Sequence, residues 1–257
     1  MWTLAPKGLL LTSGKKTESR LRAIDSYHRE GFMIVQVFDE SEVRQLETFA
    51  TEWLLDLLKE WAGGLDVPPD LGSYHAWSKS LGVDHRNTFR AKNRHTIPDA
   101  EIAEIVTNSK LRDVLTGIGL GEYTLWDEGL GWLAFRFVRP GAEDGYPMTC
   151  KFWGPAKRVV SCWVPIIGYE PAQTLTLVPG SHLNEYEKIL PNDAKFRSDE
   201  YRLIDQPKET FSPRLNRGEV ILYHPRVLHS ENVVEGGVTR LSLEYRFSPV
   251  DHSASHS

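Results

Sequence analysis

The feature that most constrains the fold is a ten-residue stretch near the end of the sequence in which residues of two kinds alternate. Between Val238 and Phe247, one alternate set is mainly apolar or aromatic, and the other carries charges and a hydroxyl. Successive side chains of a β-strand point to opposite faces, so the pattern predicts a strand with one polar face. We interpret that face, which includes Arg240 and Ser242, as lining the interior of a barrel; the alternative is an antiparallel strand with one face in water.

Two histidines precede this strand. A short apolar segment, residues 220–223, leads directly into His224, and His229 follows five residues later. A pair of glycines then separates His229 from the alternating strand. This order predicts that His229 lies at the mouth of the barrel, close to the polar face that carries Arg240.

The rest of the chain predicts helices first and short strands later. Helices are expected over residues 20–30, 39–61, 99–107 and 109–117, with Gly31 as the C-cap of the first and a strand over 32–38. Further strands are expected at 130–138, 158–165, 174–178, 219–223 and 238–247. This succession is typical of an α+β, mainly β chain built on a double-stranded β-helix (jelly roll or cupin-like), with helices packed outside. We expect one domain over residues 1–257, with residues 1–20 as a poorly specified N-terminal arm.

The amino-acid composition limits the classes of binding partner that we expect for this protein. The 257 residues are 40% hydrophobic, which is enough for a sizeable core. Thirty basic and thirty-five acidic residues give a net charge of −5 with both signs interspersed, which favours neither nucleic acid nor a membrane as partner. The two cysteines, Cys150 and Cys162, form no disulfide framework, and the N-terminal residues lack a signal-peptide pattern. We therefore expect a cytoplasmic protein that acts on a small molecule.

Several segments follow one another in an informative order. The first is Gly31-Phe-Met-Ile-Val with the long helix after it, and the second is Thr-Leu-Thr-Leu-Val-Pro-Gly-Ser-His over residues 174–182. The third comprises residues 218–225, His229 and residues 240–247. In order and spacing they resemble the opening, middle and closing parts of the phytanoyl-CoA dioxygenase family of Fe(II)/2-oxoglutarate-dependent oxygenases. The resemblance covers most of the chain and implies a double-stranded β-helix.

The resemblance implies roles for three polar residues. His229 matches the histidine that binds iron from a strand end, and Arg240 matches the arginine that pairs with the far carboxylate of 2-oxoglutarate. A planar guanidinium suits a carboxylate better than an ammonium does. Ser242, on the same strand face, could add a hydroxyl to that carboxylate. The alternative for Arg240 is an ion pair with Glu244 or another residue of the wall.

Two other histidines have a structural interpretation. His182 follows a Pro-Gly-Ser turn that recurs in the family, and His224 directly follows an apolar strand. We expect both to be hydrogen-bonded histidines of the framework rather than ligands.

The iron motif itself is absent. Such a site needs two histidines and one carboxylate on one face of the metal, and the family supplies the first two ligands as His-x-Asp or His-x-Glu. No histidine lies between His95 and His182, and Thr149 and Lys151 stand near the expected ligand positions. A protonated lysine cannot ligate iron and repels it. His229 is then the one matching metal ligand, so the residues argue against Fe(II), while 2-oxoglutarate remains an expected ligand.

Three substitutes for the missing ligands remain open. Glu143 or Asp144 could supply a carboxylate, although both lie in a glycine-rich turn. Cys150 could join His229 in a thiolate site, which suits zinc better than oxygenase iron. A histidine from residues 75–95 could also reach the mouth of the barrel.

Lys151 supports a metal-free chemistry as well. With Arg136 and Arg240 directed inward, it would form a cationic pocket for a carboxylate, a phosphate or a sugar-nucleotide diphosphate. A lysine that is partly removed from water gives up its proton more readily and can act as a base or an amine nucleophile. The alternative is a solvated or salt-bridged lysine.

Three classes of function follow from these residues. The first is a relative of the 2-oxoglutarate oxygenases with a degenerate iron site, acting on a small anionic metabolite such as a sugar, a sugar nucleotide or a secondary-metabolite intermediate. The second is a metal-independent isomerase, lyase or cyclase with Lys151 and His229 as catalytic residues. The third is a non-catalytic small-molecule binder. The family resemblance favours the first class, whereas the residues at the site favour the other two. The fold itself does not decide between the three classes, because one fold hosts many functions.

Overall fold

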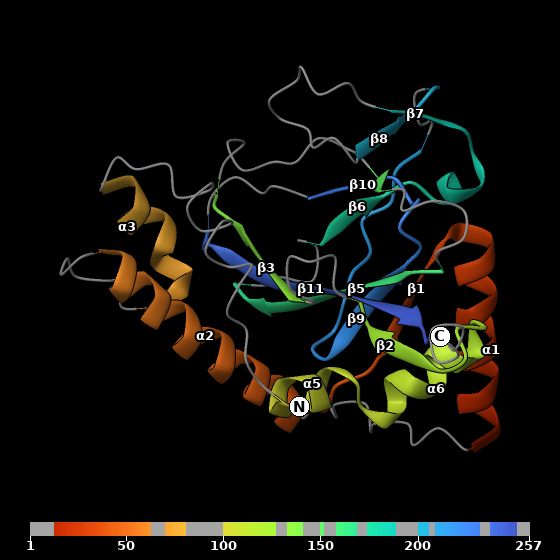
Figure 1. Ribbon diagram of the computed structural model, residues 1–257, viewed down its shortest axis with the longest axis horizontal. Coiled ribbons are helices and arrows are strands. Elements are labelled where there is room, and N and C mark those ends of the chain that lie inside the picture. Colours follow the sequence, from red (N-terminus) through yellow and green to blue (C-terminus); the bar gives the residue numbers. More distant parts are fainter. Residues whose placement is uncertain are drawn as a thin grey trace, which may run out of the picture.

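Two layers of antiparallel strands enclose the interior of the protein, and helices cover the outer face of the larger layer (Figure 1). The computed structural model describes residues 13–62, 70–80, 100–126, 133–140, 150–151, 158–168, 174–188, 200–205, 209–231 and 237–250. Among the helices of these residues, none is long and apolar enough to cross a membrane.

The larger sheet is built around the strand that the alternating sequence predicted. Its order is β1 (Phe32–Gln36), β9 (Glu219–Tyr223), β5 (Val160–Ile167), β11 (Arg240–Pro249) and β2 (Tyr123–Leu125), and β3 (Leu133–Val138) also pairs with β11. All these pairs are antiparallel. β11 therefore lies between β3 and β5 at the centre of the sheet.

Two smaller sheets complete the strand layers. β6 (Leu175–Leu177) pairs with β10 (His229–Glu231), and β8 (Glu200–Leu203) lies between β4 (Cys150–Lys151) and β7 (Tyr186–Lys188). The chain passes from β5 to β6, and later from β9 to β10 and back to β11, so it alternates between facing sheets. This is the topology of a double-sheet jelly roll. The fold is therefore α+β, mainly β, with a double-stranded β-helix, as predicted.

The described helices are α1 (Ser13–Glu30), α2 (Glu40–Ala62), α3 (Tyr74–Ser80), α5 (Ala100–Val106) and α6 (Ser109–Gly117). Short 3₁₀ turns are η1 (Leu71–Ser73) and η3 (Ser181–Leu183). α1 begins at Ser13 rather than at residue 20. Its first turns are rich in polar helix-forming residues and carry no apolar stripe, so periodicity alone did not extend the helix so far. η1 and α3 lie within residues 65–98, a stretch rich in turn-forming residues for which the sequence predicted no element.

The predicted stripe of α2 packs on the outer face of the larger sheet. Leu46, Ala50, Leu54 and Leu58 are buried in one core with the outward side chains of β3, β5 and β11. The indole of Trp53 stacks on the Phe135 ring of β3, with 4.8 Å between the ring centroids. The long amphipathic helix therefore holds the central strands from outside, while their other face is left for the interior.

Leu54→Ala is expected to lower the free energy of unfolding by about 2–5 kcal/mol, because Leu54 is fully buried and its loss leaves a cavity. Urea unfolding of the variant measures this directly. Glu52→Ala, an exposed position on the same helix, is the control and should change the unfolding free energy by roughly 0.5 kcal/mol or less. A Leu54→Ala effect as small as that of the control would contradict the packing of α2.

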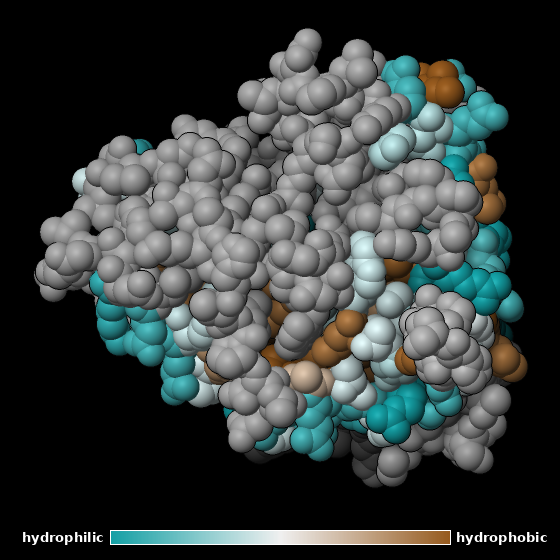
Figure 2. Space-filling model, in the orientation of Figure 1, coloured by the Kyte–Doolittle hydropathy of each residue, from teal (hydrophilic) through white to brown (hydrophobic). Residues whose placement is uncertain are grey.

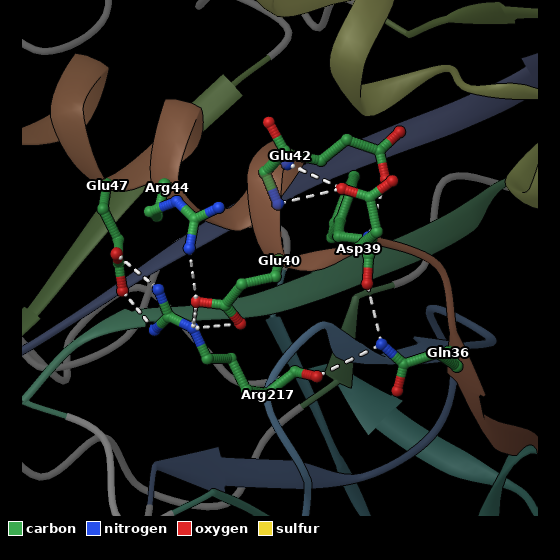
Figure 3. Close-up of polar contacts among 9 residues, drawn as sticks. Gln36, Asp39, Glu40, Glu42, Arg44, Glu47 and Arg217 are labelled. Atoms are coloured by element: carbon green, nitrogen blue, oxygen red, sulfur yellow. Dashed lines mark hydrogen bonds and ion pairs between the residues drawn. The ribbon is translucent and has the colours of Figure 1, made fainter.

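Polar contacts tie the start of α2 to the turn before β9, as Figure 3 shows. Asp39 accepts the backbone N–H groups of Ser41 and Glu42, and Glu42 accepts the N–H of Asp39 in return, which is a reciprocal cap. These N–H bonds, with Glu42 first, lower the pKa of Asp39. Arg217 donates to both carboxylate oxygens of Glu47, at 2.5 and 2.6 Å, and to Glu40 at 3.1 Å.

Large apolar side chains that are exposed on the described surface come from separate parts of the fold: Leu21, Leu183, Ile204, Phe211, Val238 and Val250. On the face drawn in Figure 2, brown side chains lie among teal ones along the right-hand edge. Scattered apolar residues of this kind are normal for a globular surface. They lie on separate elements and indicate no apolar binding face among the described residues.

Candidate functional site

The two faces of β11 have different surroundings. Its apolar side chains, Leu241, Leu243, Tyr245 and Phe247, belong to the core that α2 covers. Since side chains alternate along a strand, the other set faces the second strand layer: Arg240, Ser242, Glu244 and Arg246. The polar face predicted from the sequence is therefore the inner face of the jelly roll.

Apolar side chains fill the half of the interior beneath β1, β5 and β9. This cluster joins residues of the larger sheet to the facing strand β6: Phe32, Trp163, Leu175, Leu177, Leu215, Ile221, Tyr223 and Val227. The polar residues of β11 and β3 occupy the remaining part. A ligand in the interior would therefore lie against β11 and β3.

A charged cluster lies on this polar side. Arg136 of β3 donates from Nε and Nη2 to Oε2 of Glu244, at 2.8 and 2.7 Å. Arg246 donates to the other oxygen, Oε1. The side chains of Glu244 and Arg246 are each 9% exposed and that of Arg136 is 20% exposed. One buried carboxylate is therefore shared by two guanidinium groups, those of Arg136 and Arg246.

Arg240 and Ser242 lie at the start of β11. Arg240 is half-buried and opposite Val138, and Ser242 is buried and opposite Arg136. On its other side β11 shows a register shift between Leu241 and Ser242 against β5, the mark of a bulge. Bulges often occur beside functional sites, where they redirect a side chain. The structure thus brings both predicted carboxylate-binding residues to one face, and Arg136, which the sequence also predicted to point inward, lies opposite Ser242.

His229 is the first residue of β10 and lies opposite Leu177. Its Nδ1 is 2.8 Å from the carbonyl oxygen of Val227, and a carbonyl can only accept, so Nδ1 carries the proton. Nε2 is then the nitrogen with the lone pair. Metal-binding histidines are commonly held in this way by a backbone carbonyl. The structure places His229 at the start of a strand in a tautomer that would suit a metal or a proton, and its role as a ligand stays a prediction.

Tyr223 lies next to His229, with 4.9 Å between the ring centroids. Burial, reinforced by the Glu244 carboxylate, raises the pKa of Tyr223 far above its usual value. Its hydroxyl therefore stays protonated at any physiological pH. Sequence reasoning placed Tyr223 only in an apolar strand, because nothing in the local pattern showed that its ring would meet His229.

The histidines His182 and His224 belong to the framework, as predicted. His182 has Nε2 3.3 Å from the carbonyl oxygen of His28, and the Nδ1 of His224 accepts the backbone N–H of Arg226. The two rings are 5.5 Å apart. Burial lowers the pKa of His182, and burial together with His182 lowers that of His224 to about 4, so both are neutral at pH 7.

These histidines pack against Gly31, the predicted C-cap of α1. Its φ is 84°, and a Cβ at this position would lie 2.5 Å from His182 Nδ1 and 2.4 Å from Val227. Only glycine fits such a close approach at positive φ. The His224 N–H donates to the Gly31 carbonyl at 2.7 Å. The C-terminal end of α1 thereby fixes the turn that leads into His229.

Lys151 lies on β4, where it pairs with Glu200 of β8. Its side chain falls outside the described residues, as do Thr149, Glu143 and Asp144 and the side chain of Cys150. The catalytic role of Lys151 therefore stays a prediction. Cys162 is buried with a free thiol, and burial raises the pKa of that thiol to about 12, so it is inert.

Of the histidines in the stretch 75–95, the structure describes His75, which contacts the residue that precedes β11. His75 of α3 donates its backbone N–H to Thr239 Oγ1, and its Nδ1 is 3.1 Å from both that oxygen and the Gly72 carbonyl. Thr239 directly precedes Arg240. Arg139, which follows β3, donates to Ser78 of the same helix at 3.4 Å. α3 is thus attached across the end of the β3–β11 pair.

The donor set does not fit the usual iron centre. His229 has a suitable tautomer, but the sequence places a lysine at Lys151, near where a carboxylate ligand would be needed, and an ammonium repels the ion. Within the described residues no three His, Cys, Asp or Glu side chains are grouped so that they could hold a metal.

Comparison with known proteins identifies solved structures that share the fold of this chain. No family model matches the sequence, and no curated protein matches it. Among solved structures, AviO1 from Streptomyces viridochromogenes Tue57 is similar with a TM-score of 0.57 and 17% identity, over 89% of this chain and 94% of that one.

Two further solved structures, those of the enzymes SnoK and SnoN, are similar as well. SnoK is from nogalamycin biosynthesis, and SnoN is in complex with nogalamycin RO. The non-heme α-ketoglutarate-dependent carbocyclase SnoK has a TM-score of 0.54 and 17% identity, over 90% of this chain and 84% of that one. The epimerase SnoN, in complex with Fe³⁺, α-ketoglutarate and nogalamycin RO, has a TM-score of 0.51 and 16% identity, over 91% and 84%. The chain therefore has the fold of the non-heme α-ketoglutarate-dependent enzymes, and α-ketoglutarate is another name for 2-oxoglutarate.

Proposed function

We propose that this protein binds a small anionic metabolite against Arg240 and Ser242 in the jelly roll, as a 2-oxoglutarate-oxygenase relative with a degenerate iron site. The observation that carries this proposal is the shared inner face of β11, on which Arg240 is half-buried and Ser242 is buried. A guanidinium binds a carboxylate through two parallel hydrogen bonds, and a hydroxyl can add a third. The ligand we use as reference is 2-oxoglutarate.

The surroundings of this pair favour an anion. Arg136 lies directly across from Ser242, and the apolar cluster beneath β1 and β9 confines a ligand to the side of the interior where these charges lie. Electrostatic attraction is stronger between partly buried groups than between groups in water. The net charge of −5 would not by itself attract an anion, so the proposal depends on the local placement of the arginines.

The neighbouring structures support both the ligand and a range of chemistries on this fold. SnoN carries Fe³⁺ and α-ketoglutarate in its structure, while SnoK is a carbocyclase and SnoN an epimerase. By analogy, the anionic ligand here is 2-oxoglutarate or a metabolite of similar size, such as a sugar, a sugar nucleotide or a secondary-metabolite intermediate. In the sequence, Lys151 stands near a position where the family has an iron ligand. For this reason the proposal concerns binding of the anion and does not include a reaction at iron.

A metal-independent isomerase, lyase or cyclase is the second candidate. The specific observation in its favour is the pair formed by His229 and Tyr223, whose rings are in contact. Nε2 of His229 can accept a proton. The buried Tyr223 ring packs against the imidazole, and its raised pKa makes its hydroxyl a poor proton donor. Lys151 would join this pair as a base or amine nucleophile.

Arg240→Ala is expected to weaken 2-oxoglutarate binding by about 30- to 100-fold, because it removes a charge-assisted, two-point contact. Ser242→Ala should cost about five- to tenfold, the value of one hydrogen bond. Isothermal titration of the purified protein, with and without added Fe(II), measures both. Arg44→Ala, an exposed arginine on α2, is the matched control and should bind as wild type. Arg240→Ala with unchanged affinity would refute the proposal.

Metal analysis of freshly purified protein is expected to show well below one equivalent of iron, with no turnover of 2-oxoglutarate. One imidazole cannot hold Fe(II) against water, and a lysine ammonium at about 4 Å would add roughly 4 kcal/mol of repulsion at an effective dielectric of 20. Mass spectrometry and succinate release are the readouts. Stoichiometric iron that disappears in His229→Ala would contradict this prediction and would reveal ligands that the sequence pattern does not show.

A further inference from the structure

The turn between β9 and β10, residues 224–228, is attached to two other elements of the fold. The backbone N–H of His224 donates to the Gly31 carbonyl, at the end of α1, at 2.7 Å. The backbone N–H of Leu228 donates to Ser181 Oγ, at the start of η3, at 2.8 Å. The position of β10 in its sheet therefore depends on how this turn is held.

The imidazole of His224 holds the turn together from inside. Its Nδ1 accepts the backbone N–H of Arg226 at 3.1 Å, so Nδ1 has the lone pair and Nε2 carries the proton. A second proton on this ring would have to bind Nδ1. Two donors would then face each other across the same 3.1 Å, and the hydrogen bond would be lost. A protonated His224 therefore does not fit the turn as the structure shows it.

A second buried imidazole packs against the first, with 5.5 Å between the ring centroids of His182 and His224. Nε2 of His182 is 3.3 Å from the His28 carbonyl oxygen, which can only accept, so Nε2 carries the proton. Nδ1 is buried and has no hydrogen-bond partner among the described residues. A Cβ at Gly31 would lie 2.5 Å from this Nδ1, so water cannot enter from that side. A proton on Nδ1 of His182 would have no acceptor there.

The charged groups around the two rings do little to stabilise a protonated imidazole. Arg226 acts on both rings and His28 of α1 acts on His182, and each disfavours a further positive charge. Glu30 is the acidic group that acts on His182 among the described residues. Its carboxylate already binds the Arg29 guanidinium at 2.6 Å. The surroundings therefore keep both rings neutral at pH 7.

Acid shifts the balance between this closed turn and an open one. Burial lowers the pKa of His182, and burial together with His182 and Arg226 lowers the pKa of His224 to about 4. In an open turn both rings would be in water and would have the ordinary value of about 6.5. The lowered pKa of His224 therefore favours the closed turn above pH 6.5, and this advantage is lost as the pH falls toward 4.

We propose that residues 224–228 form an acid-operated latch, in which protonation of His224 and His182 opens the turn locally while the larger sheet stays folded. In the closed latch the Val227 carbonyl oxygen is 2.8 Å from Nδ1 of His229 and fixes the tautomer of that ring. Opening of the latch moves this carbonyl, so His229 loses that constraint. The latch needs no bound ligand. It therefore goes beyond the proposed function, and either can fail without the other.

Amide hydrogen exchange, followed by NMR on the full chain from pH 7 to pH 5, tests the latch. The amides of Arg226, Val227 and Leu228 report on the turn, after correction for the intrinsic effect of pH on exchange. Their opening equilibrium is expected to rise about 20-fold, the ratio for one imidazole with a pKa of about 4 when closed and 6.5 when open.

Urea separates local opening from global unfolding. The reference amide is that of Leu222, which is fully buried on β9 between two neighbouring strands. Urea below the unfolding transition should accelerate exchange at Leu222 and leave the three turn amides unchanged, because a local opening exposes little surface.

His224→Asn removes the titrating group and keeps an acceptor for the Arg226 N–H. Its turn amides should be protected at pH 7 as in wild type, and the 20-fold response should fall to about fivefold or less, the remainder coming from His182. His28→Asn, at an exposed position on α1, is the matched control and should respond as wild type. His224→Gln replaces the asparagine variant if that variant does not fold.

Three outcomes would overturn the latch. The first is a wild-type protein whose turn amides exchange no faster toward pH 5 after correction. The second is acceleration of the turn amides by urea in parallel with Leu222, which would show that they exchange through global unfolding. The third is a wild-type response to acid in the variants of His224.

Discussion

Glu244→Ala is expected to destabilise the protein by about 3–5 kcal/mol, because it leaves the guanidinium groups of Arg136 and Arg246 buried without the carboxylate that they share. The side chains of Glu244 and Arg246 are each 9% exposed, so water cannot take over the lost contact at low cost. Strands β3 and β11 meet at this carboxylate. The loss should therefore appear as lower unfolding free energy in urea, measured by tryptophan fluorescence.

Two comparisons isolate the cause of that loss. Glu244→Gln keeps the size of the side chain and should be less destabilising than alanine, since an amide oxygen still accepts hydrogen bonds. Arg217→Ala removes a guanidinium with several contacts to Glu40 and Glu47, but at 45% exposure, so its effect should stay within roughly 1 kcal/mol. If Glu244→Ala is no more harmful than Arg217→Ala, the charged cluster does not have the buried character that its exposure indicates.

Acidification from pH 7 to pH 4 is expected to remove about 3 kcal/mol of folding free energy through His224 alone. Burial, with His182 and Arg226 nearby, lowers the pKa of His224 to about 4, whereas the unfolded chain has the ordinary value of 6.5. Between these values the unfolded state binds a proton that the native state does not. The contribution is fully present above pH 6.5, is lost as the pH falls toward 4, and does not change further below it. His182 acts in the same direction.

The measurement is the pH dependence of urea unfolding for wild type and for His224→Asn. The asparagine carbonyl can replace Nδ1 as the acceptor of the Arg226 N–H, but it cannot titrate. The variant should therefore show a flatter decline between pH 6.5 and 4, after subtraction of the carboxylate contributions common to both proteins. Parallel curves for the two proteins would show that His224 is not buried as a neutral imidazole.

The parts of the fold that the sequence predicted are those where one pattern persists over many residues. The stripe of α2 and the alternation of β11 each repeat over two or more turns or pleats, and both are confirmed. β4, β6, β7 and β10 have only two or three residues each, too few for a period, and β4, β7 and β10 were not predicted. β11 begins at Arg240 rather than at 238, because the Thr239 N–H donates to Gly72 and not to a neighbouring strand.

The place of a site residue could be predicted where it depends on which face of a strand the residue occupies. It could not be predicted where it depends on how distant strands pair with one another. Arg240 and Ser242 could be assigned to the inner face because they are two residues apart. The partner of Glu244 could not be assigned, since Arg136 lies 108 residues away and only strand pairing brings them together. The same holds for the contact of His229 with Tyr223 and for the approach of His75 to Thr239. The role of Lys151 stays a prediction.

The position of β1 and β11 in the larger sheet has a consequence for how the chain reaches its native state. Phe32 of β1 pairs with Tyr223 of β9 about 190 residues later, and β11 supplies the strand between β3 and β5. At a synthesis rate of roughly 5–20 residues per second, β1 waits on the order of 10–40 s for its partner. During that time its apolar residues lack their final neighbours. Completion of this sheet therefore follows synthesis of β11, and pairings between residues so distant in sequence form slowly.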